Sequence, residues 1–229
     1  MLQRISKNLI LKSFIMKRRQ ALKNIGLGAG IFIVGPSALS LLQSCKNEPE
    51  YEWQPTFLSA SQGFVLQKVL DVILPTTDTP GASDLNIAQF IDSYMQEVAE
   101  PDRAENFKKS ADAFSRAFEN EFDKSQDKGE IEDFETSIKK YLKASQAQQE
   151  EYMKRNSETQ DAQSQEGEVT LDNDAGAYAY LSTVRDMAIW AWKNSEQVGE
   201  EILWYDPIPG EYIPCGPVSE LGGGKAMSL

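Results

Sequence analysis

The stretch from residue 107 to residue 122, FKKSADAFSRAFENEF, decides the fold of this chain. Among its apolar residues, Phe107, Ala111, Phe114, Phe118 and Phe122 are spaced four, three, four and four apart. Residues three and four apart share one face of an α-helix, so this spacing predicts a helix with an aromatic stripe. Four phenylalanines on one stripe could also line a cofactor pocket, but packing in a helical core is the favoured interpretation.

The segments on either side of this stretch repeat the helical pattern. Ser59-Ala60-Ser61-Gln62 is a capping-box pattern, and it opens a helix that Pro75 ends. Further helices are predicted at 87–98, at 134–142, through Tyr152 and Met153, and at about 174–195. No segment alternates as a strand does. The sequence therefore predicts an all-α fold, a small irregular bundle of about six helices followed by a non-helical segment rich in proline and glycine.

The chain divides into four predicted parts. Residues 1–45 form a leader, 46–56 a tether, 57–218 the helical domain and 219–229 a flexible tail that contains three consecutive glycines. Within the domain, residues 156–173 carry almost nothing apolar and are predicted to form a mobile acidic insertion. Pro80-Gly81 suits the two central positions of a type II turn.

The leader combines a basic start with a charge-free stretch from Asn24 to Ser44. Arg18 and Arg19 form a pair typical of a twin-arginine export signal, and Met16 is an alternative start that leaves the pair intact. Leu42-Gln43-Ser44-Cys45 resembles a bacterial lipobox, which predicts a lipid on Cys45. We therefore expect export to the periplasm or cell envelope and anchoring at the membrane. An uncleaved signal anchor is the alternative.

The remaining chain is strongly acidic and lacks histidine. From Cys45 onward it holds 16 basic and 35 acidic residues, a formal charge of −19, which argues against binding to nucleic acid or to anionic lipid surfaces. Without histidine there is no Ser-His-Asp or Cys-His arrangement, and the single further thiol cannot build a metal centre. That thiol, Cys215, is either free or bonded to another chain. We expect no catalytic residue, metal or cofactor in this chain.

Two charged features leave room for other interpretations. Asp71 and Asp78 could form an acid–base pair, although solvated helix faces are the favoured interpretation of the many carboxylates. Arg185 stands on an otherwise apolar stretch and could pair with a buried carboxylate.

Aromatic residues are dense toward the C-terminus. Trp190 and Trp192 lie about 200° apart on a helix, so one helix face cannot bury both. Large aromatic side chains beyond the needs of a core are enriched at protein interfaces. Cover by the irregular C-terminal segment is the alternative.

Three motifs carry a family resemblance. Ile73-Leu74-Pro75-Thr76-Thr77-Asp78-Thr79-Pro80-Gly81-Ala82, Asn194-Ser195-Glu196-Gln197-Val198-Gly199 and Tyr205-Asp206-Pro207-Ile208-Pro209-Gly210-Glu211-Tyr212 resemble the gluconate 2-dehydrogenase subunit 3 family. The resemblance spans about 59–215. It implies a small exported, non-catalytic subunit whose partner is a flavin-dependent sugar or sugar-acid dehydrogenase of the glucose–methanol–choline type. FAD would then belong to that large subunit, and haem c to a cytochrome c subunit.

The same resemblance implies that the motifs rich in proline and glycine are rigid loops that bind the partner. The candidate interface residues are Pro75, Thr79, Pro80, Gly81, Trp204, Tyr205, Asp206, Pro207, Pro209, Gly210, Tyr212 and Cys215. Two alternatives remain open at this point. One is a stand-alone envelope lipoprotein that binds a ligand or scaffolds other proteins, and the other is an independent enzyme that uses carboxylates.

Overall fold

The computed structural model describes residues 53–166, 170–208, 210 and 215–228. The chain divides into two compact units, Met1–Glu50 and Tyr51–Leu229, and only the second contains described residues. The predicted export signal at Arg18 and Arg19, the predicted lipidation site at Cys45 and most of the tether lie outside the described residues.

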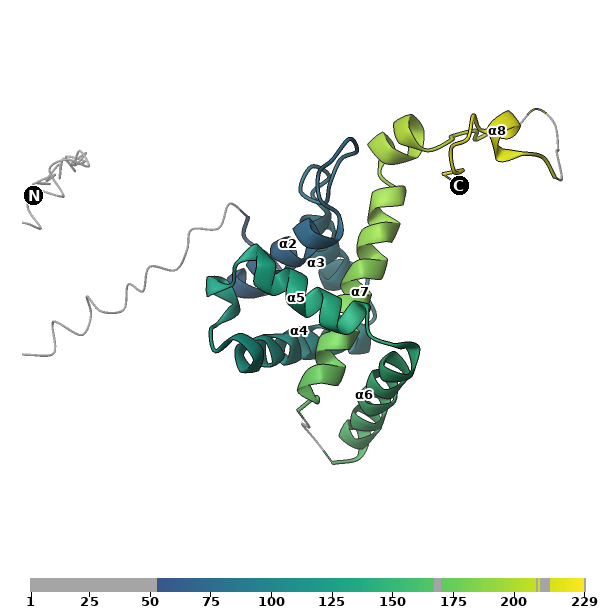
Figure 1. The fold of residues 1–229 in the computed structure, drawn as a ribbon. Helices are drawn as coiled ribbons and strands as arrows, with labels where there is room; N and C mark the ends of the chain where they lie inside the picture. The colour runs from purple at the N-terminus through teal and green to yellow at the C-terminus, as the bar shows by residue number, and fades with distance from the viewer. Residues whose placement is uncertain (1–52, 167–169, 209, 211–214, 229) are drawn as a thin grey trace, which may run out of the picture. The chain divides into compact units, whose positions relative to one another are not determined.

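The described part of the chain is helical, which confirms the all-α prediction (Figure 1). Its longer helices are α2 (Ala60–Ile73), α3 (Ile87–Glu97), α4 (Pro101–Phe122), α5 (Ile131–Leu142), α6 (Gln146–Glu166) and α7 (Asn173–Lys193). The short elements are η2 (Gln126–Lys128), the π-helix η3 (Gln197–Ile202) and α8 (Val218–Leu221). Among the described residues β-pairing is limited to one bridge, between Trp204 and Met227. None of the described helices is long and apolar enough to cross a membrane.

Helix α7 is the centre of the bundle. It packs against α2, α3, α4, α5 and α6, and Figure 1 shows it running between them. A helix with neighbours on several sides needs small and apolar residues around most of its circumference. The side chains that α7 buries fit this need: Ala175, Ala177, Tyr178, Tyr180, Leu181, Val184, Met187 and Ala188.

The aromatic stripe of α4 packs against α7 and α5. Phe107 and Phe114 each lie with the ring centroid 5.4 Å from that of Tyr180, and Phe118 lies 5.0 Å from Phe134. Phe107, Phe114 and Phe118 are buried, so the stripe is core packing, as the spacing predicts. Burial raises the pKa of Tyr180, because the phenolate would lose its hydration.

A buried carboxylate fastens the segment before α2 to the bundle. Asp92, on α3, is 1% exposed and accepts hydrogen bonds from the backbone N–H groups of Thr56, Phe57 and Leu58 at 2.7–3.2 Å. The Thr56 hydroxyl also donates to it, at 2.9 Å. An unpaired buried charge would be costly, and these donors compensate for its lost hydration. The last residues of the predicted tether are therefore part of the folded domain.

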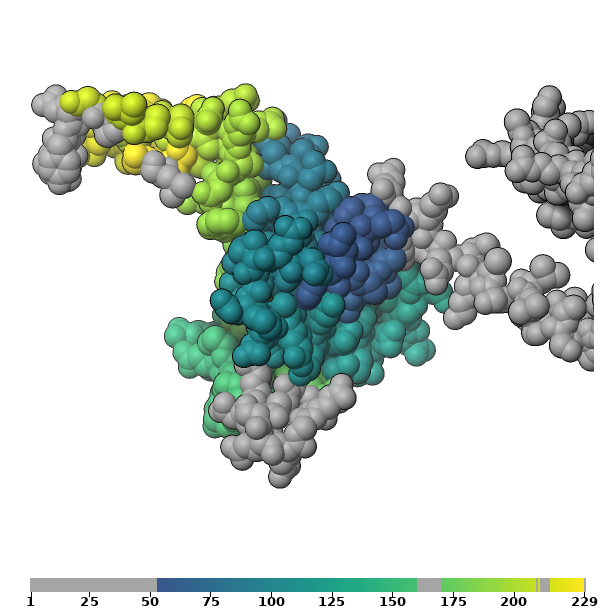
Figure 2. Space-filling model, turned by 180° about the vertical axis from the view of Figure 1, so that it is seen from behind, coloured from purple at the N-terminus to yellow at the C-terminus, as the bar shows by residue number. Residues whose placement is uncertain are grey.

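Helix α2 begins as the sequence predicts and packs against α3, α5 and α7. Ser59 and Gln62 form the capping box, with each side chain bonded to the other's backbone N–H. Gln62 Nε2 also donates to Asp112 Oδ1 of α4 at 2.8 Å. Figure 2 shows the blue surface of α2 beside the blue-green surface of the helices that follow it in the chain.

The structure corrects the predicted acidic insertion at 156–173. Instead of starting a loop at Asn156, the chain continues α6 to Glu166. The segment 146–166 contains neither glycine nor proline and is rich in glutamine and glutamate, which favour helix. Its low content of apolar residues predicts disorder, but the strong helix propensity of its residues decides the outcome.

The predicted flexible tail is also partly wrong. Residues Val218–Leu221 form α8, and Trp204 is paired with the last described residues. Its N–H donates to the Ala226 carbonyl at 2.8 Å, and its carbonyl accepts from the Ser228 N–H at 2.9 Å. The ring of Trp204 packs closely against Gly222. These contacts close the segment 204–228 on itself.

Candidate partner-binding face

The loop between α2 and α3 is held in one shape by its own polar groups. Asp84 Oδ2 accepts from the Thr76 hydroxyl at 2.6 Å and from the Gly81 N–H at 2.7 Å. These two bonds lower the pKa of Asp84, because both stabilise its charged form. The Ala82 N–H donates to the Leu74 carbonyl at 2.8 Å and closes the base of the loop. The motif that the sequence analysis singles out is therefore a preorganised loop.

Gly81 is required here for space, and the predicted type II turn is wrong. A type II turn needs a positive φ at its second central residue, whereas the described glycines with positive φ are Gly223 and Gly224. Gly81 instead packs against the backbone at the start of the loop. A Cβ at this position would lie 2.8 Å from the Leu74 carbonyl oxygen and from the Pro75 carbonyl carbon, and would also clash with Thr76 N.

Trp192 fixes this loop to the central helix. Its Nε1–H donates to the Pro80 carbonyl at 2.8 Å, a bond between residues 112 positions apart in the sequence. Figure 1 shows the loop after α2 beside the C-terminal end of α7. Trp192 is also partly buried against the core. Nothing in the local sequence pattern predicts this bond, because the two residues meet only in the folded bundle.

Trp190 points away from Trp192 and is exposed, as their offset of about 200° on a helix predicts. It is 53% exposed, and its ring centroid lies 5.6 Å from that of Phe90 on α3, itself 36% exposed. Phe90 in turn lies 6.1 Å from Tyr94. Its spacing from Ile87 and Ile91 predicts that Phe90 shares their inward face, and its exposure corrects this prediction. Together Phe90, Tyr94 and Trp190 form a surface that we call the aromatic strip.

The second candidate motif, at 204–215, is separate from the loop. Tyr205 is 49% and Ile208 is 85% exposed, and Pro207, Gly210 and Cys215 are also exposed. Trp204 and Asp206 are half-buried, while Pro209 and Tyr212 lie outside the described residues. No hydrogen bond or ion pair between described residues joins this segment to the loop at 74–82. The structure thus brings Pro75, Thr79, Pro80 and Gly81 together but does not join them to the second group.

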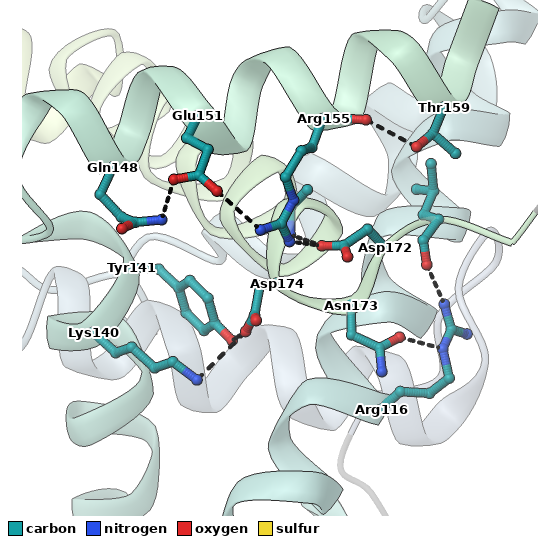
Figure 3. A network of polar contacts seen from close by, with 12 residues as sticks. Arg116, Lys140, Tyr141, Gln148, Glu151, Arg155, Thr159, Asp172, Asn173 and Asp174 are labelled. Carbon is teal, nitrogen blue, oxygen red and sulfur yellow. Dashed lines mark hydrogen bonds and ion pairs between the residues drawn. The ribbon is translucent and has the colours of Figure 1, made fainter. Parts of the chain in front are cut away.

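A polar network surrounds the N-terminus of α7, and it is the other candidate for chemistry (Figure 3). Tyr141 donates to Asp174 at 2.6 Å, and Lys140 pairs with Asp174 at 3.4 Å and with Glu121 at 3.1 Å. Burial raises the pKa of Tyr141, and the bond to Asp174 raises it further. A phenol held in its neutral form is a poor proton donor or nucleophile near neutral pH.

The rest of the network anchors α6 to α7. Arg155 of α6 forms ion pairs with Glu151 and Asp172, and Asp172 accepts from the Ala175 N–H at 2.8 Å as the N-cap of α7. Burial alone would raise the pKa of Asp172, but the bonds from Ala175 and Arg155 outweigh it and lower that pKa. These carboxylates serve helix capping and ion pairing, which is a structural role.

The other charged candidates, Asp71 and Arg185, have their charged neighbours close by in the chain or in the adjoining loop. The pKa of Asp71 is raised, mainly because the side chain is partly buried. The nearby charge of Lys68 lowers this pKa, and that of Asp84 raises it. Arg185 pairs with its neighbour Asp186 on the exposed side of α7, so the predicted partner, a buried carboxylate, is wrong. Within the described ranges, no three residues among His, Cys, Asp and Glu are grouped so that they could hold a metal ion.

Comparisons with known proteins agree with the motifs. The family model described as gluconate 2-dehydrogenase subunit 3 matches residues 60–210, which covers α2 to α7 and the start of the C-terminal segment. No curated protein and no solved structure is significantly similar to the chain.

Proposed function

Because the chain belongs to the gluconate 2-dehydrogenase subunit 3 family, we propose that it is a non-catalytic accessory subunit that binds a flavin-dependent sugar or sugar-acid dehydrogenase. In this role it helps the large subunit to mature, accompanies it across the membrane and holds it there through a lipid on Cys45. The flavin, FAD, belongs to the large subunit, and haem c to a cytochrome c subunit where one is present.

Two observations carry this proposal: the braced loop at 74–82 and the exposed aromatic strip. The loop keeps one shape in the free subunit through Asp84, Gly81 and Trp192, so little conformational entropy is lost when a partner binds it. Trp190 and Phe90 expose apolar surface that the core does not need, and exposed tryptophan is typical of energetic centres in interfaces. A preorganised loop and an exposed aromatic surface both suit an accessory subunit that binds a partner.

The leader supplies the second support. A flavoprotein that folds around its cofactor in the cytoplasm must cross the membrane folded, and a subunit without its own signal can travel with one that has it. Arg18 and Arg19 would then serve both subunits.

Purification of the native complex from membranes tests the proposal. We expect a flavin-containing large subunit to co-purify with this chain, and recovery of this chain alone in every preparation would contradict it. Replacing Arg18 and Arg19 with lysine should leave the dehydrogenase activity in the cytoplasmic fraction. A control that replaces Lys7 and Lys12, which lie outside the arginine pair, should leave the activity in the envelope.

A further inference from the structure

Arg103 has no acidic partner among the described residues of this strongly acidic chain. Among the described arginines, Arg155 and Arg185 form ion pairs, and Arg116 donates to Asn173 and to the Leu171 carbonyl. The guanidinium of Arg103 instead lies over the ring of Tyr94, with Cζ 5.5 Å from the centroid, and its one bond is a long contact of 3.5 Å with the Tyr94 hydroxyl. Stacking fixes the group in place and leaves most of its five donors available.

The same guanidinium stands at a cavity of about 380 Å³ between α3, α4, α6 and α7. Met95, Phe107 and Ala179 give this cavity an apolar side, and Asn106, Ser110, Asn156 and Thr183 give it a polar side. Cavities of this size are large enough to take a ligand group.

The polar side of the cavity has unused hydrogen-bonding capacity. Asn156 Oδ1 is shielded from solvent and has no hydrogen-bond partner. Among the described residues, the side chains of Asn106 and Thr183 also form no hydrogen bond. Buried polar atoms are normally paired, so the unpaired Oδ1 of Asn156 in the same cavity as the exposed guanidinium of Arg103 indicates a place where another molecule supplies a hydrogen-bond donor.

The aromatic strip leads from the surface of the bundle to this cavity. Trp190 contacts Phe90, Phe90 contacts Tyr94, and Tyr94 carries Arg103 on its ring. The path therefore runs from exposed apolar rings to a cation and then to unpaired amides, all on the helical bundle. An extended peptide offers matching groups in the same order: an apolar side chain, a carboxylate and backbone amides.

We propose that Arg103 and this cavity bind an acidic side chain or a C-terminal carboxylate on an extended segment of the partner subunit. The inference rests on the proposed function and adds the chemistry of the contact. The carboxylate accepts two hydrogen bonds from the guanidinium, the Asn106 and Asn156 amides pair with the segment's peptide groups, and its apolar residue covers Phe90 and Trp190. A guanidinium that already stacks on an aromatic ring loses little freedom when it binds.

Affinity measurements on the purified complex test this proposal. The dehydrogenase subunit that co-purifies with the chain is titrated against the wild type and against Arg103→Gln, Arg103→Lys and Lys128→Gln. Arg103→Gln should weaken binding about 10- to 100-fold, because a hydrogen-bonded charge pair is lost. The affinity of Arg103→Lys should lie between those of the wild type and Arg103→Gln, since lysine keeps the charge but cannot donate two parallel hydrogen bonds to one carboxylate. Lys128 is exposed and forms no ion pair, so Lys128→Gln controls for net charge.

A crosslinking experiment identifies the occupant. With p-benzoylphenylalanine in place of Asn106, the crosslinked peptide of the dehydrogenase subunit should contain aspartate, glutamate or its C-terminus close to the crosslink. A synthetic peptide with the sequence of the crosslinked peptide should bind the wild-type chain more tightly than a peptide in which an amide replaces that carboxylate. A crosslinked peptide with no such carboxylate would overturn the proposal.

Failure of this inference is distinguishable from failure of the proposed function. A wild-type chain that binds no dehydrogenase subunit contradicts the function itself. A wild-type chain that binds, together with an Arg103→Gln variant of equal affinity, overturns only the role of Arg103 and the cavity. The thermal unfolding midpoint of Arg103→Gln should fall only slightly, because the substitution removes one exposed contact with the Tyr94 ring and no ion pair between described residues.

Discussion

At the scale of single residues, Gly81 shows how one missing side chain shapes a loop. A methyl group there would press against the backbone of Leu74, Pro75 and Thr76. We expect Gly81→Ala to lower the free energy of unfolding by about 1–3 kcal/mol, because the backbone cannot yield as a flexible side chain would. Urea denaturation measures the change. Gly210→Ala is the matched control, since a Cβ there meets nothing within 4 Å and stability should not change.

Asp92 is the second residue whose role one substitution isolates. Asp92→Asn replaces one carboxylate oxygen by an NH₂ group that faces the donors of Thr56, Phe57 and Leu58. We expect a loss of about 1.5–3 kcal/mol in the free energy of unfolding, because bonds to a charged acceptor are lost in a buried site. Asp112→Asn, at an exposed carboxylate with a single bond, should change stability by less than about 0.5 kcal/mol. Equal effects of the two variants would refute this role for Asp92.

At the scale of elements, the junction of α6 and α7 depends on the charge of Asp172. Its pKa lies below the ordinary value of 3.8, so its charged form contributes stability above pH 3.8 and loses it as the pH falls below that value. Asp172→Asn keeps an oxygen for the N-cap bond but removes the ion pair with Arg155.

We therefore expect the wild type to be more stable than Asp172→Asn at neutral pH and the difference to shrink below pH 3.8. Thermal unfolding followed by circular dichroism over a pH series would show this convergence. Asp172→Ala should lose a further 0.5–2 kcal/mol, approximately, at all pH values because it also removes the cap. A difference between wild type and Asp172→Asn that does not change with pH would contradict the assignment.

Sequence patterns predict the helices better than the tertiary contacts between them. The phenylalanine spacing of α4 and the capping box of α2 depend on neighbours in the chain, and both are confirmed. The bond from Trp192 to Pro80 and the contacts of Asp92 join residues more than 30 positions apart, and no local pattern contains them. The same limit applies to Arg103, whose lack of an acidic partner is visible only in the fold. For α6, composition and helix propensity give opposite predictions, and propensity decides.

At the scale of the whole molecule, the two neighbouring tryptophans separate binding from folding. Trp190 is exposed, so Trp190→Ala should leave the free energy of unfolding within about 0.5 kcal/mol of the wild type. It should weaken binding of the dehydrogenase subunit by about 2 kcal/mol or more, as the loss of a central aromatic contact does. Surface plasmon resonance with the dehydrogenase subunit immobilised measures this loss of affinity.

Trp192→Phe should act differently, because the ring fills the core while its Nε1–H holds the loop. We expect a loss of about 0.5–1.5 kcal/mol in stability, and weaker binding that appears mainly in the association rate, since the loop must then be ordered on binding. If Trp190→Ala destabilises the free subunit as much as Trp192→Phe, the aromatic strip belongs to the core and the docking face must be sought elsewhere.

The hydrogen bonds between Asp92 and Thr56 also fix the point where the tether ends and the folded domain begins. Thr56 stands eleven residues after Cys45, and a fully stretched chain covers at most about 3.6 Å per residue. The distance between Cys45 and Thr56 is therefore at most roughly 40 Å. With a lipid on Cys45, a bound dehydrogenase would stay within a thin layer of water next to the bilayer. Confinement to such a layer raises its local concentration toward any electron acceptor embedded in the same membrane. By fixing the end of the tether, the buried carboxylate of Asp92 would thus influence how often the dehydrogenase and its electron acceptor encounter each other.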